Sequence, residues 1–157
     1  MAGPRRRARE VALQILIQGD VSPELEGAAA SRLYFDHLAD LAQRDDVDGD
    51  DDAAARTSPA DRALIDELVL GVAAKREELD AIVQELSRNW RLERMALVER
   101  NIIRLALYEL KYVTSVPTNV ALNEAVELAK RFGTSEGAAF VNGLLDRAVT
   151  ELQLRRN

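Results

Sequence analysis

Four arginines lie within five residues near the start of the chain: Arg5, Arg6, Arg7 and Arg9. A guanidinium group can bind a phosphate through two parallel hydrogen bonds, and phosphate contacts supply the sequence-independent part of nucleic-acid affinity. The alternative is a solvated, frayed terminus, which short basic runs often are. Because the cluster opens a segment with a helical apolar stripe, we expect a docked helix to hold these arginines in place. They are the best candidates for contacts to RNA.

A second candidate is Phe140, which lies close to the pair Asn142–Gly143. Glycine inside a helix costs ~1 kcal/mol relative to alanine, so a helix that keeps one usually brings its backbone close to another backbone or to a ligand. Single-stranded RNA is commonly bound by stacking its bases on aromatic rings. With one Trp, three Tyr and three Phe in the chain, few such rings exist. On the residues alone, the ordinary interpretation of Phe140 is a ring that packs between helices; a stacking role comes from the family resemblance described below.

A run of aspartates accounts for the whole formal net charge of −6: Asp45, Asp46, Asp48, Asp50, Asp51 and Asp52. An EF-hand calcium loop starting at Asp46 would need glycine where Asp51 stands and glutamate where Thr57 stands. Blocks of like charge repel themselves and bury little apolar area. We therefore expect an acidic, solvated loop over about residues 44–57 and no metal site.

The residues needed for catalysis are scarce. His37 is the only histidine, cysteine is absent, and no glycine-rich phosphate loop or serine elbow occurs. We predict no enzyme, no catalytic site and no cofactor. The absence of cysteine fits a reducing cytosol, and no signal peptide or membrane-spanning stretch is visible. We expect a cytoplasmic protein that does not enter a membrane.

Apolar spacing predicts helices along almost the whole chain. After a disordered start at residues 1–4, helices are expected over residues 5–18, 23–43, 58–86, 94–112, 119–132 and 135–152. Gly19 is expected to end the first of these helices, and the third is expected to kink near Gly71. The prediction is an all-α, compact single-domain bundle of about six to seven helices, covering residues 5–153.

Three local features complete this prediction. Residues 94–112 are apolar on most sides, which is typical of a central helix packed by several neighbours. Gly133 is expected to end its helix in the left-handed conformation, with Thr134 or Ser135 capping the next helix. Trp90 interrupts the helical pattern and is expected to fill a gap between two helical layers.

Three motifs in this order resemble the NusB family of bacterial transcription antitermination factors. They are RNIIRLALYEL at residues 100–110, VALNEAVELAKRFG at 120–133 and FVNGLLD at 140–146. With the arginine-rich start, the resemblance covers residues 5–18 and 64–149. It implies a NusB-like fold and an RNA-binding factor that, with NusE (a small-subunit ribosomal protein), binds single-stranded boxA RNA. In the RNA polymerase antitermination complex, such a factor supports read-through in ribosomal RNA operons.

The resemblance also assigns roles to residues of this chain. It implies RNA contacts for the arginine cluster and for Phe140, and an acidic residue near the RNA or partner surface at Glu99. Taken alone, Glu99 would be an exposed helix glutamate beside Arg100 or Arg104. The chain departs from the family at Ile17, where many relatives have tyrosine, and at Ala139, where a basic residue is common. Both changes remove possible RNA contacts.

Two other functions remain open on the residues alone. One is a non-catalytic helical adaptor that binds only proteins, against which the arginine cluster argues. The other is a detached NusB-like domain of the kind fused to ribosomal RNA methyltransferases. The chain offers no segment that could bind S-adenosylmethionine, which argues against that second function.

Overall fold

The computed structural model describes residues 4–22, 24, 27, 31, 32, 35, 36, 59–88 and 90–156. The elements with defined bounds within these ranges are six α-helices and one short 3-10 helix. Residues 31, 32, 35 and 36 are also helical, and no described residue lies in a strand. The all-α prediction is confirmed. None of these helices combines the length and the apolar character needed to cross a bilayer. The predicted acidic loop at 44–57, residues 1–3 and most of the helix expected over 23–43 lie outside the described residues.

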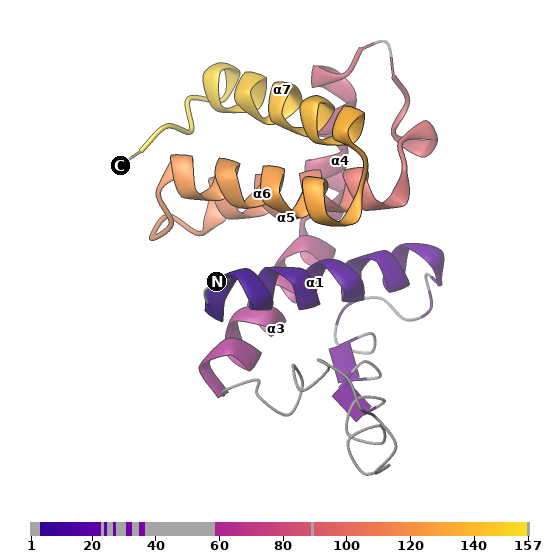
Figure 1. Ribbon diagram of the computed structural model, residues 1–157, viewed down its shortest axis with the longest axis vertical. Helices are drawn as coiled ribbons and strands as arrows, with labels where there is room; N and C mark the ends of the chain where they lie inside the picture. Colours follow the sequence, from indigo (N-terminus) through magenta and orange to yellow (C-terminus); the bar gives the residue numbers. More distant parts are fainter. Residues whose placement is uncertain are drawn as a thin grey trace. The chain divides into compact units, whose positions relative to one another are not determined.

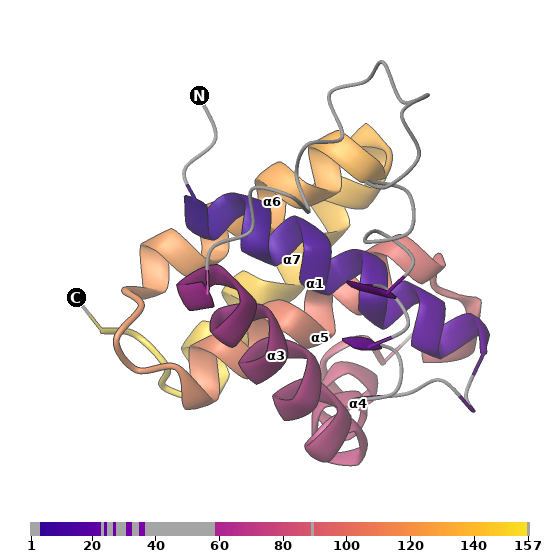
Figure 2. The same cartoon turned by 90° about the horizontal axis from the view of Figure 1, so that it is seen from below.

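The chain divides into two compact units, Met1–Leu70 and Gly71–Asn157. The first unit contains helix α1, Pro4–Val21 (Figure 2). Proline suits the first helical position, because its fixed φ matches the helix and its missing N–H has no partner there. Of the apolar residues expected on its buried side, Ala8, Ala12 and Ile15 are buried, whereas Leu16 is partly exposed. Gly19 does not end the helix: the N–H of Ser22 donates to the carbonyl of Gln18 at 2.9 Å, so the helical pattern continues past it.

Helix α3, Pro59–Ala74, begins where the sequence predicts, with proline at the start and Asp61 in the first turn. An acidic group there interacts favourably with the positive end of the helix dipole. In the first unit, the guanidinium of Arg62 lies 3.5 Å from the centre of the Phe35 ring. The hydroxyl of Ser31 donates to Asp66 at 2.7 Å.

The second unit is built around α5, Leu97–Tyr112, which contacts α4, α6 and α7. These neighbours are α4, Arg76–Leu86; α6, Thr118–Phe132; and α7, Ser135–Glu151. Figure 1 shows α6 and α7 running beside each other. All seven residues from 101 to 107 are buried. The prediction of a central helix is confirmed.

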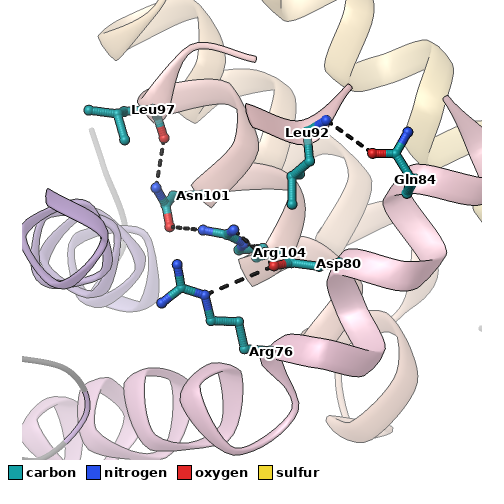
Figure 3. A network of polar contacts seen from close by, with 7 residues as sticks. All are labelled: Arg76, Asp80, Gln84, Leu92, Leu97, Asn101 and Arg104. Carbon is teal, nitrogen blue, oxygen red and sulfur yellow. Dashed lines mark hydrogen bonds and ion pairs between the residues drawn. The ribbon is translucent and has the colours of Figure 1, made fainter. Parts of the chain in front are cut away.

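Polar side chains join α4 to α5 (Figure 3). Arg104 donates two hydrogen bonds to the carboxylate of Asp80, at 2.6 and 3.0 Å, and a third to Asn101 at 3.2 Å. Asn101 in turn donates to the carbonyl of Leu97 at 2.8 Å. Arg104 is only 4% exposed. A buried guanidinium needs such partners, because removing it from water is costly.

The helix break predicted near Gly71 lies at Lys75, between α3 and α4. Gly71 itself is helical, and its importance is spatial. A Cβ at this position would lie 2.5 Å from Cε2 of Tyr108, well inside contact distance. The sequence shows only that the residue is small. The structure shows that a larger residue would collide with the Tyr108 ring of α5.

Candidate nucleic-acid interface

The predicted arginine cluster lies on the first turns of α1, where its members differ in exposure. Arg5 and Arg7 are exposed and Arg6 is partly exposed. Arg9 is only 5% exposed and has a partner within the protein. Of the four RNA-binding candidates, Arg9 is therefore the one whose side chain is buried. It lies three and four residues before the buried Ala12 and Leu13, and residues at these spacings share one face of a helix.

Phe140 lies on α7, and its side chain is half-buried. The nearby pair Asn142–Gly143 is exposed. A Cβ at Gly143 would meet no described atom within 4 Å. The described part of the fold therefore gives no steric reason for glycine here.

Glu99 is not the solvated glutamate that its sequence context indicates. It is 7% exposed, and its Oε2 has no hydrogen-bond partner among the described residues. Arg104, a predicted neighbour for its charge, pairs with Asp80. A buried carboxylate oxygen of this kind costs free energy unless it finds a donor.

Two glycines make room for the Glu99 side chain. A Cβ at Gly133 would lie 2.7 Å from Oε1 of Glu99, and a Cβ at Gly137 would lie 2.8 Å from its Cδ. Gly133 has φ −115°, so it does not adopt the predicted left-handed conformation. Its role is to leave space for the carboxylate. The cap prediction is confirmed: Oγ1 of Thr134 accepts a hydrogen bond from the N–H of Gly137 at 2.9 Å.

Trp90 does not fill a gap between helical layers, because 55% of it is exposed. It lies in the connection between α4 and α5, whose described residues include the buried Ser87 and Met95. The sequence signal for an exposed surface was the spacing of Arg88, Arg91 and Arg94 around the tryptophan. Charged residues on both sides of an aromatic residue are more typical of a solvent-facing segment than of a core position.

No group of three or more histidine, cysteine or acidic side chains that could hold a metal ion occurs among the described residues. The aspartate run that prompted the calcium question lies outside them.

A model of the NusB family matches residues 6–150 of the chain. The chain belongs to the NusB family. Two relatives are each named transcription antitermination protein NusB. The protein from Desulforudis audaxviator is 45% identical over 147 residues, which cover 94% of each chain. The protein from Myxococcus xanthus is 43% identical over 150 residues, covering 96% of this chain and 97% of the relative.

Solved structures agree with this assignment to the NusB family. NusB of T. maritima superposes with a TM-score of 0.77 at 27% identity, covering 96% of this chain and 94% of that one. A second structure is described as antitermination factors NusB and NusE in complex with dsRNA. It has a TM-score of 0.74 at 21% identity and covers 96% of this chain and 99% of that chain. At that identity the likeness concerns the fold.

Proposed function

We propose that this NusB-family chain is an RNA-binding transcription antitermination factor. In this proposal it binds boxA-type single-stranded RNA together with NusE and supports read-through in ribosomal RNA operons. The observation that carries the proposal is that Arg5, Arg6 and Arg7 are exposed or partly exposed at the start of α1, within a chain 45% identical to a transcription antitermination protein NusB. In this role the protein positions the RNA through its charge and shape, and no covalent bond is made or broken. We accordingly propose that the protein is no enzyme and acts in the cytoplasm.

The proposed RNA contacts are Arg5, Arg6, Arg7 and Phe140. The three arginines are at least partly exposed on one helix, and the half-buried Phe140 lies beside the open backbone at Gly143. Guanidiniums supply phosphate contacts, which position the strand without reading its bases. The exposed Ala139 adds no charge next to Phe140, so we expect affinity to depend mainly on the arginines.

Arg9 and Glu99 have positioning roles in this proposal, because both are buried. Arg9 would orient α1, and Glu99 would hold the connection between α6 and α7 against Gly133 and Gly137. An RNA contact by either side chain would first require its exposure. This assignment separates them from the surface arginines, although all were candidates from the sequence.

The test is an RNA titration across a salt series, using fluorescence anisotropy of a labelled boxA-type RNA. Three phosphate contacts on a single strand predict that log affinity falls with log salt with a slope of about −2.1, at roughly −0.7 per contact. Replacing Arg5, Arg6 and Arg7 together by alanine should flatten this slope. NusE binding by the same variant should persist, since α1 remains folded.

A matched control removes the same charge elsewhere, by alanine at the exposed Lys75, Lys130 and Arg155. Its RNA affinity should stay close to wild type. If the α1 variant binds RNA with unchanged affinity and slope, the arginines do not bind RNA. If the wild type binds NusE but no RNA, the protein-binding adaptor becomes the better proposal.

A further inference from the structure

The connection between α4 and α5 carries a second basic surface, separate in sequence from the arginine cluster of α1. Between Ser87 and Ala96 the chain has Arg88, Arg91 and Arg94 against one carboxylate, Glu93. Three positive charges and one negative charge leave a local charge of +2 in a chain whose total is −6. All three arginines are exposed.

These arginines are not used to hold the protein together. Their side chains make no hydrogen bond, ion pair or ring contact with any residue that the structure describes. This contrasts with Arg104 and Arg156, whose guanidiniums are fully engaged inside the second unit. Three guanidiniums without a partner among the described residues can bind phosphates.

Trp90 stands among these arginines with its indole largely in water. An exposed fraction of 55% leaves a large apolar ring without cover by the described chain. Aromatic rings beside positive charge form the stacking platforms that bind single-stranded nucleic acid, because every base offers a flat face. A protein partner would also accept an aromatic ring, but the local charge of +2 favours a polyanion.

The backbone beneath the indole is firmly held. The N–H of Trp90 donates to the carbonyl of Ser87 at 2.8 Å, and the Trp90 carbonyl accepts from the Ser87 hydroxyl at 3.1 Å. The side chain of Gln84 spans the connection, since its oxygen accepts from the N–H of Leu92 at 3.2 Å (Figure 3). The platform is therefore pre-organised, which lowers the entropic cost of binding.

We propose that Trp90, with Arg88, Arg91 and Arg94, forms a second contact site for single-stranded RNA, in which the indole stacks on an unpaired base. This inference rests on the proposed RNA-binding function and extends it to the α4–α5 connection. The arginines hold the adjacent phosphates, and the stacking is tolerant of base identity. The site thus increases the affinity for RNA and the length of RNA that is bound, and it contributes little to sequence preference.

The chain offers a direct reporter, because Trp90 is its only tryptophan. A short unlabelled single-stranded RNA should quench the tryptophan emission of the full chain saturably. The midpoint should match that of an independent anisotropy titration with labelled RNA. Trp90→Ala should weaken RNA binding by roughly 5- to 150-fold, the value of one stacked base. Trp90→Phe should recover much of that affinity, because a smaller ring still stacks.

Alanine at Arg88, Arg91 and Arg94 should reduce the magnitude of the salt slope by up to about 2.1. The control with alanine at Lys75, Lys130 and Arg155 should bind as wild type does. If RNA binds by anisotropy while the emission stays constant and Trp90→Ala binds normally, this inference is wrong and the proposed function stands. If no RNA binds by either method, both fail. Quenching by NusE alone, with no further effect of RNA, would also overturn the site.

Discussion

Helices α5 and α7 lie in the same unit and contact each other, yet they have different surfaces. In α5 seven consecutive residues, 101–107, are buried, including the polar Asn101 and Arg104. In α7 buried and exposed positions alternate with the helical repeat, and the exposed side includes Asn142 and Gly143. The difference shows that α5 is packed on most sides, whereas α7 is packed on one face and exposed on the other.

Two glycines of α7 show the same contrast, between packed and exposed positions, within a single helix. At Gly137 a Cβ would collide with the buried side chain of Glu99 from α5, whereas at Gly143 it would meet nothing within 4 Å. The first glycine is required by packing. The second lowers helix stability without a steric reason in the described fold. Alanine at the two positions should therefore change the free energy of unfolding in opposite directions.

The largest effect is expected in α5. Ile102→Ala should lower the free energy of unfolding by about 2–5 kcal/mol, because a fully buried isoleucine leaves a cavity. Chemical denaturation followed by circular dichroism measures this change. Glu127→Ala, on the exposed side of α6, is the control and should stay within about 0.5 kcal/mol of wild type. Similar stabilities for both variants would show that α5 is not the centre of the unit.

The second-largest effect tests whether the buried polar residues of α5 contribute to stability as its apolar residues do. Asp80→Ala should cost about 3 kcal/mol, the lower end for breaking a buried ion pair, since Arg104 loses its carboxylate while Asp80 is partly exposed. The same denaturation experiment applies to Lys130→Ala, which breaks an exposed pair with Glu127. That loss should be under about 1 kcal/mol. Equal losses would contradict the structural role given to Arg104.

A smaller loss is expected at the first glycine of α7. Gly137→Ala should cost up to about 2 kcal/mol, because overpacking costs roughly 1–3 and the gain in helix propensity offsets about 1. In a Glu99→Ala background the same substitution should be neutral or stabilising, since the collision is gone. A double-mutant cycle in thermal unfolding measures this coupling. Strictly additive effects would show that Glu99 and Gly137 do not touch.

The smallest effect should have the opposite sign. Gly143→Ala should raise the free energy of unfolding by up to about 1 kcal/mol, because alanine is the better helix former and its Cβ enters open space. Differential scanning calorimetry beside wild type would detect the higher melting temperature. A lower one would mean that this face of α7 is covered within the protein, and the contrast with α5 would lose its basis.

Local sequence signals determined where the helices lie. The apolar spacing at Ala125, Ala129, Val141 and Leu145 placed α6 and α7 correctly, because the helical period decides which side chains face the core. Pro59 and Thr134 marked helix starts through the local chemistry of the backbone. The NusB family was also recognisable, since its motifs are contiguous stretches of sequence.

Burial of individual polar residues was decided only by the tertiary structure. Glu99 and Arg9 read as surface charges along the chain, and Trp90 as a core residue, but the structure has the reverse. Likewise, Arg156 near the carboxyl end donates to carbonyls at the end of α5, including that of Leu110 at 2.6 Å. No local sequence pattern predicts such contacts, because they depend on residues tens of positions away in the chain. The sequence by itself determined most of the helix positions and the family, whereas packing decided which charged side chains are buried in the fold and which stay exposed.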